Sequence, residues 1–245
     1  MGISGLIRML VREALQIDLD DPELDAADSR WAGWISTLGE KGLRAGWAPP
    51  GEGAPGSVKG RDASAFYAWD VEKGRTVAIV AVSKNNAEGT RGSGPDGMPV
   101  YSVKWSQSDM MGIGIGSMLY ELALEWASES GFWLASDRDE VSPAAQKVWS
   151  KMQLRGDIEK VRLDDEENTM TPRDEDNFEV PKDWGGPLDS VWGPAARQEV
   201  RNSPLARRAA IRLSPLMWGY RKGGGRPLWD ELARLGLTVT RKKDE

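Results

Sequence analysis

The chain has 245 residues, a formal net charge of −6, and neither cysteine nor histidine. These two absences exclude disulfides, thiolate catalysis, a histidine general base and ordinary zinc sites, so we expect no metal centre. Proton transfer has to use carboxylates, hydroxyls, lysine or water. The length suits one sizeable core with additions or two small units, and the apolar runs are too short to cross a bilayer, so no membrane partner is expected.

The first 45 residues are predicted to be mostly helical. An amphipathic helix is expected over residues 3–16, and a second helical region over about residues 21–43. We expect the first helix to dock on the protein's own sheet rather than on a membrane. No strand is recognisable before these helices, and the glycine- and proline-rich residues 46–60 are predicted to form a loop.

Three strands are predicted in the middle of the chain. Residues 63–71 and 75–83 are expected to pair as a hairpin around residues 72–74. A third strand is expected from residue 99 to about residue 105. Residues 86–98, which precede it, form a second glycine-rich loop in a place suited to a lid or a substrate-binding loop.

A glycine-rich turn connects the third strand to an amphipathic helix. Residues 112–117 (Gly-Ile-Gly-Ile-Gly-Ser) are followed by apolar residues in helical spacing. This combination exposes unpaired backbone N–H groups at the positive end of the helix dipole, which is an anion site typically used for a pyrophosphate. Glycine runs before helices are also often plain turns, so both interpretations stay open at this point.

A second strand and helix follow. Gly131 is expected to end the first helix as its C′ residue, and residues 132–136 to form a short buried strand. Ser142 and Pro143 are expected to start another helix as its N-cap and first helical residue. Residues 155–163 are predicted to supply a late strand.

From about residue 63 to residue 151, the chain resembles the GCN5-related N-acetyltransferase (GNAT) family. That family has Gln/Arg-x-x-Gly-x-Gly/Ala before the first helix and Asn/Ser-x-x-Ala-x-x-x-Tyr-x-Lys on the second; residues 111–116 and 142–151 match in order and spacing. The resemblance implies an α/β (α+β) fold with a mixed, mostly antiparallel sheet flanked by helices. It also implies acetyl-CoA as acyl donor and direct attack of a primary amine on the thioester. The cofactor-binding residues would be Met111, Gly112, Ile113, Gly114, Ile115, Gly116, Ser117 and Ser142.

Two positions depart from the family motifs. Met111 stands where the family has Gln or Arg, and Trp149 stands where it has the tyrosine that protonates the departing thiolate. An indole N–H does not act as a general acid at neutral pH. Without histidine, the base has to be a carboxylate acting through water. The candidates are Asp137 first, then Asp109 or Asp139, although each also suits a cap or a turn.

The charge changes sign along the last third of the chain. Residues 193–245 carry 12 Lys and Arg against 5 Asp and Glu, after a dense acidic stretch. We therefore expect a GNAT-like domain (residues 1–165, with 1–45 as its helical N-terminal part), an acidic linker (166–192) and a basic C-terminal extension (193–245). The basic residues between 197 and 226 are expected to fold back on the acidic body, or to bind nucleic acid or a protein.

Residues 136–149, with residues 163–165 and 171–172, are also similar to GNAT-type proteins encoded by tailed bacteriophages. This similarity leaves the amine substrate open, with a nucleic-acid or protein amine as candidates. It implies a location in the cytoplasm of a bacterial host or in a virion. An enzyme is favoured, but Met111 and Trp149 support an alternative: a structural or interaction protein with the GNAT fold, such as a virion component, with weak or no catalysis.

Overall fold

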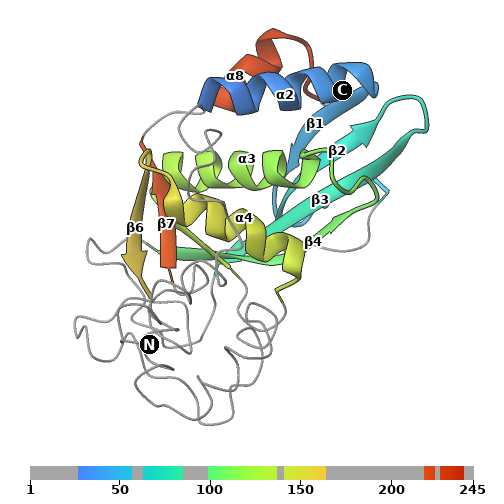
Figure 1. Cartoon of the computed structure of the whole chain (residues 1–245). Helices are drawn as coiled ribbons and strands as arrows, with labels where there is room; N and C mark the ends of the chain where they lie inside the picture. Colours follow the sequence, from blue (N-terminus) through green and yellow to red (C-terminus); the bar gives the residue numbers. More distant parts are fainter. Residues whose placement is uncertain are drawn as a thin grey trace, which may run out of the picture. The chain divides into compact units, whose positions relative to one another are not determined.

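The computed structural model describes residues 27–56, 63–84, 99–136, 141–163, 218–223 and 227–239. In chain order, the elements are α2 (Ala27–Glu40), β1 (Leu43–Ala48), β2 (Ser64–Asp70), β3 (Arg75–Lys84), β4 (Val100–Ser108), α3 (Ile115–Glu129), β5 (Trp133–Ser136), α4 (Pro143–Leu154), β6 (Ile158–Arg162), β7 (Trp218–Lys222) and α8 (Pro227–Arg234) (Figure 1). The strands form one mostly antiparallel sheet in the order β1-β2-β3-β4-β5-β7-β6. The predicted class, a mixed and mostly antiparallel α/β fold, is confirmed at this level.

The described residues divide into two compact units. The α3 unit contains residues 27–56, 63–84, 101–134, 221–223 and 227–239, and the α4 unit contains residues 99–100, 135–136, 141–163 and 218–220. The helix predicted over residues 3–16, the loop predicted over residues 86–98 and the acidic linker lie outside the described residues.

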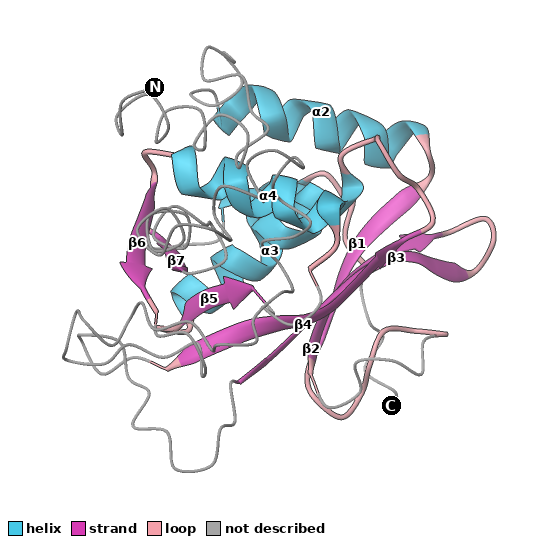
Figure 2. Ribbon diagram, turned by 60° about the horizontal axis from the view of Figure 1, so that its bottom comes forward, coloured by secondary structure: helices cyan, strands magenta, loops and turns pink. Residues whose placement is uncertain are grey.

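Strands β1 to β4 form an antiparallel meander. The predicted hairpin is confirmed, because β2 and β3 pair across the turn after Asp70. Directly paired residues point to the same face of a sheet, so Trp47, Phe66 and Val80 share one face. The ring of Phe66 lies 5.8 Å from that of Trp126 in α3, so α3 packs on this face, as Figure 2 also shows.

β1 contradicts two predictions, the helix to about residue 43 and the loop that begins at residue 46. The helix α2 ends at Glu40, and the chain turns through Gly42, whose φ is +63°, into a strand. Gly46 made this strand look like a loop in the sequence. In the fold its missing side chain makes room for a neighbouring strand, because a Cβ atom there would overlap the ring of Tyr67.

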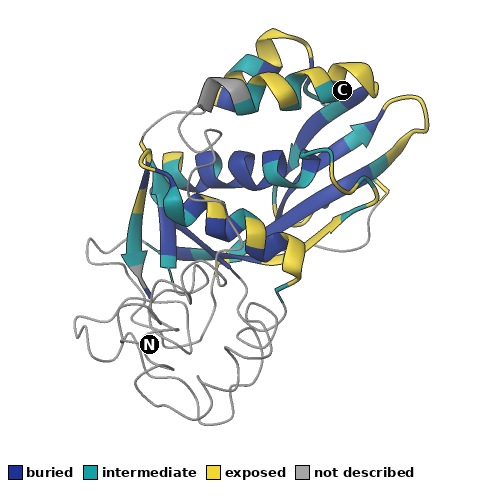
Figure 3. Ribbon diagram, in the orientation of Figure 1, coloured by how far each residue is buried: buried dark blue, intermediate teal, exposed yellow. Residues whose placement is uncertain are grey.

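The helix α3 begins and ends as its glycines predict. At its C-terminus, Gly131 has φ +75° and donates its N–H to the carbonyl of Ser128 at 3.1 Å. The N–H of Phe132 reaches back to the carbonyl of Ala127 at 2.7 Å. These two bonds are a Schellman motif, which satisfies carbonyls at the helix end. Figure 3 shows that most of α3 is buried, so this helix is the central core element of its unit.

In the α4 unit, the predicted second helix is confirmed. Ser142 accepts a hydrogen bond from the N–H of Ala145 at 3.2 Å, and Pro143 is the first helical residue. Trp149 is 1 % exposed, and its ring stacks on that of Tyr220 with 5.4 Å between centroids. Trp149 therefore belongs to the core of this unit.

Candidate functional site

The turn between β4 and α3 is the candidate anion site. Gly112 and Gly114 both have left-handed φ angles, +81° and +82°, which only glycine adopts without strain. The first described hydrogen bond of α3 runs from the N–H of Met118 to the carbonyl of Gly114 at 3.0 Å. The N–H groups of residues 115–117 precede it, so no carbonyl of the helix reaches them.

Within the part of the chain that the structure describes, no side chain caps this helix end. Gly114 is the N-cap residue and has no side chain that could accept a hydrogen bond from these N–H groups, and the first turn of α3 contains no Asp or Glu. In contrast, Ser142 caps α4, and the carboxylate of Glu125 accepts hydrogen bonds from the N–H groups of Leu228 and Trp229 in the first turn of α8. Among the described side chains, none therefore uses the N–H groups or offsets the positive dipole end at the N-terminus of α3, an arrangement that favours an anion.

Strand β5 can pair with only part of the β4 edge beside this turn. β4 has nine residues and β5 has four, so β5 can pair with no more than about half of β4. The ring of Phe132, directly before β5, stacks on Tyr101 near the start of β4 with 4.4 Å between centroids. β5 therefore lies beside the first half of β4. The second half, where Ser106 and Gln107 are exposed, leads directly into the glycine-rich turn.

Helix α2 packs against the turn at Gly114. A Cβ atom on Gly114 would lie 2.9 Å from both Cδ1 and Nε1 of the Trp34 indole. Gly112 and Gly116 differ from it, because a Cβ atom on either would meet nothing within 4 Å. The turn is thus packed against the protein at Gly114 and open at Gly112 and Gly116.

Among the predicted catalytic carboxylates, the structure describes only Asp109. Its side chain is exposed and forms an ion pair with Arg75 at 2.9 Å, and its N–H donates to the carbonyl of Val77 at 2.8 Å. These contacts fasten the end of β4 to β3, two residues before Met111. Asp137 and Asp139 lie outside the described residues. Ser142 belongs to the α4 unit, where its hydroxyl caps α4.

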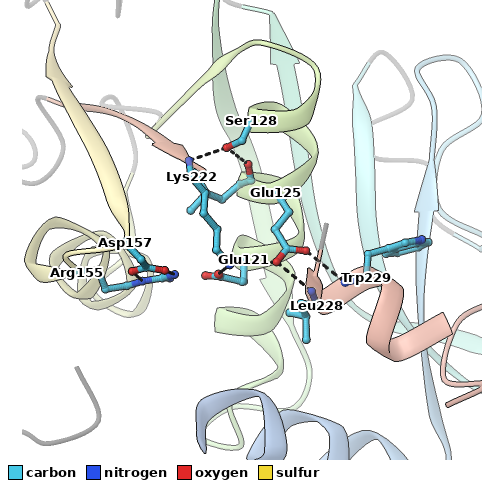
Figure 4. Close-up of polar contacts among 9 residues, drawn as sticks. Glu121, Glu125, Ser128, Arg155, Asp157, Lys222, Leu228 and Trp229 are labelled. Carbon is cyan, nitrogen blue, oxygen red and sulfur yellow. Dashed lines mark hydrogen bonds and ion pairs between the residues drawn. The ribbon is translucent and has the colours of Figure 1, made fainter. Parts of the chain in front are cut away.

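A buried ionic cluster on α3 was not foreseen from the sequence. The ammonium of Lys222 lies 2.7 Å from a carboxylate oxygen of Glu121 and 3.2 Å from one of Glu125 (Figure 4). The exposed fractions of these side chains are 10 %, 2 % and 0 % for Lys222, Glu121 and Glu125. Burial raises the pKa of Glu125, while Lys222 and the N–H of Leu228 act in the opposite direction. The sequence signal that could have indicated this cluster is a pair of acids one turn apart on the apolar face.

Comparisons of the chain with protein-family models, with curated proteins and with solved structures found no match. The resemblance to the GNAT family therefore stays a prediction. Of the helices in the described residues, none combines the length and the apolar character needed to span a membrane.

Proposed function

We propose that the protein is an acetyl-CoA-dependent N-acetyltransferase of the GNAT type. The observation that carries the proposal is the N-terminus of α3, which no described side chain caps and which follows a glycine-rich turn and the second half of β4 within one unit. Backbone N–H groups of residues 112–117 would hold the pyrophosphate of the cofactor. The pantetheine arm carries amide groups and would pair with the second half of the β4 edge like an added strand.

The reaction would be direct acyl transfer. The amine nitrogen forms a bond to the thioester carbonyl carbon, the C–S bond breaks, and the thiolate leaves. The amine proton passes through water to a carboxylate, for which Asp137, Asp109 and Asp139 remain the candidates. The departing thiolate takes its proton from water, because the buried indole of Trp149 cannot supply one.

Gly116 provides the sharpest test of the site. The position is helical and has open space around its Cβ, so a side chain there should leave the fold intact. Gly116→Asp places a negative charge in the first turn of α3, and Gly116→Asn is the neutral control of the same size. Like charges a few ångströms apart near a protein surface cost several kcal/mol. We therefore expect the wild type to bind acetyl-CoA and CoA by titration calorimetry, and the Asp variant to bind at least about tenfold more weakly than the Asn variant.

Two results would contradict the proposal. One is that neither acetyl-CoA nor CoA binds the wild type or raises its melting temperature. The other is that the Asp and Asn variants bind equally well while remaining folded, because the pyrophosphate would then lie elsewhere.

The alternative is an interaction protein with the same fold and without turnover, such as a virion component. The burial of Trp149 favours it, since the position that carries the family's acid is part of a core. Release of free thiol from acetyl-CoA in the presence of amine acceptors separates the two proposals. Cofactor binding without thiol release over many acceptors would favour the interaction protein.

Nucleic acid remains a candidate acceptor or partner, but Arg221 and Lys222 contribute less to it than the sequence suggests. The guanidinium of Arg221 lies 4.3 Å from the ring centroid of Trp133, and Lys222 is bound to two glutamates. The test should therefore neutralise Arg207, Arg208 and Arg226, outside the described residues. If the three residues contact phosphates, the salt slope of duplex binding should fall by about 0.9 for each contact. No binding of DNA or RNA at low salt would end this proposal.

A further inference from the structure

Two tryptophans fasten α2 to the part of the protein that carries the candidate site. Trp31 and Trp34 are three residues apart and therefore lie on the same side of the helix. Trp34 contacts the glycine-rich turn, and Trp31 contacts Lys222, which is bound to the middle of α3. α2 is thus attached at two points to the helix whose N-terminus forms the site.

The contact at Trp34 is with the backbone of the turn. Two indole atoms lie 2.9 Å from where the Cβ atom of Gly114 would be, so only a glycine accepts the ring so close. Gly114 is also the left-handed N-cap residue of α3, where no described side chain forms a capping hydrogen bond. The Trp34 ring is therefore the described side chain best placed to fix the turn.

The contact at Trp31 is through the face of its ring. The Lys222 ammonium lies 4.9 Å from the ring centroid, within the range of a cation–π interaction. Among the described residues, the buried Nε1 of Trp31 has no hydrogen-bond partner. The contribution of this side chain thus comes from its ring face and its packing, which a phenyl ring also provides.

We infer that Trp34 is a positioning residue for the anion site. The Trp31–Lys222 contact fixes the position of α2 and thereby the position of Trp34. The inference rests on the proposed function. The N–H groups of the turn bind an anion well only if they point to it before it arrives, because ordering them on binding reduces the affinity. Trp34 supplies this order from outside the turn, and Trp31 acts through Trp34.

The test uses Trp34→Leu, Trp31→Leu, Trp31→Phe and the Trp31→Leu/Trp34→Leu double variant. We expect Trp34→Leu to bind CoA about tenfold more weakly and Trp31→Leu about fivefold, at the lower end of couplings between protein sites. Trp31→Phe should bind nearly as the wild type does. Because Trp31 acts through Trp34, the double variant should bind no more weakly than Trp34→Leu alone. Additive losses would overturn the inference.

A second measurement does not depend on any ligand. The amide of Met118 is bonded to the carbonyl of Gly114, so its hydrogen exchange in the free protein reports the order of the turn. It should exchange several times faster in Trp34→Leu. The control is Ile79→Ala in the apolar cluster around Tyr67, on the face of β3 opposite to Val80 and α3. This variant should lose stability without changing the exchange of Met118 relative to global unfolding, or the affinity for CoA.

The outcomes separate this inference from the proposed function. If the wild type does not bind CoA, the proposed function fails, and the exchange of Met118 still tests the role of Trp34. If the wild type binds and Trp34→Leu matches it in affinity and in exchange, the proposed function stands and the inference is wrong. Equal losses of CoA affinity in Trp34→Leu and Ile79→Ala would also overturn the inference.

Discussion

Replacing Lys222 by methionine should be among the most damaging single changes in the described part of the chain. Its ammonium is 10 % exposed and contacts Glu121 and Glu125, which are 2 % and 0 % exposed. Removal takes away the ammonium that lies within ion-pair distance of both buried carboxylates. Breaking a buried ion pair from one side costs about 3–5 kcal/mol, a large part of the 5–15 kcal/mol by which a typical domain is stable. For a chain of this size, that corresponds to a fall in melting temperature of roughly 6–20 °C.

The loss should shrink as the pH falls. Burial already raises the pKa of Glu125 above its ordinary value of 4.5, and Lys222 acts against that rise. Without Lys222 the folded-state pKa rises further, so the folded protein binds a proton that the unfolded chain releases. Such a group stabilises the folded state at pH values below its folded-state pKa, and this stabilisation is lost as the pH rises through that pKa. One proton changes the free energy of unfolding by at most about 1.4 kcal/mol per pH unit, so lowering the pH from about 7 to about 5.5 should restore part of the lost stability.

Urea unfolding followed by tryptophan fluorescence at both pH values measures these quantities. Lys41→Met is the matched control, because it removes the same charge from an exposed position. Its free energy of unfolding should stay within about 0.5 kcal/mol of the wild type. A loss below about 1 kcal/mol for Lys222→Met at neutral pH would refute the reasoning, as would a loss that is the same at both pH values.

Further variants test the helix ends and the core. Gly116→Ala should raise the free energy of unfolding by about 0.5–1 kcal/mol in urea titrations, because the residue is helical and has open space. Gly114→Ala should lower the free energy of unfolding by at least about 1–2 kcal/mol, because a left-handed φ and the Trp34 ring both disfavour a side chain there. Ser142→Ala should cost about 1 kcal/mol in the same measurement, through loss of the α4 cap. Trp149→Tyr should cost about 1–3 kcal/mol and leave thiol release from acetyl-CoA unchanged, since the position is buried.

Elements with local signals could be predicted from the sequence. The β2–β3 hairpin, α3 with its closing Gly131, and α4 with Ser142 and Pro143 all follow from residues within one or two turns of each boundary. β1 could not be predicted, because Gly46, which suggested a loop, is required by a contact with a residue far away in the sequence. Gly46 accommodates Tyr67, 21 positions further along the chain.

Only the backbone of the candidate site could be predicted from the sequence, and not its side-chain contacts. The glycine-rich turn and the start of α3 have the expected place, and Asp109 lies near them in an ion pair with Arg75. The packing of Trp34 on Gly114 joins residues 80 positions apart, and Lys222 meets Glu121 from 101 positions away. No local pattern contains such contacts. Residues 218–222, which lie within the predicted basic C-terminal extension, form a strand of the sheet.

The distribution of acids around α3 is the strongest argument that its N-terminus is reserved for a ligand. The helix buries two carboxylates in its middle. Lys222 and the N–H groups in the first turn of α8 offset the free-energy cost of desolvating them. It has none in its first turn, where a carboxylate would stabilise the helix by about 0.3–1 kcal/mol. An acid there would also repel a pyrophosphate, and a capping side chain would occupy the N–H groups that bind one. The stability forgone at this end is small, and it leaves the positive end of the most buried helix in the unit available to an anion.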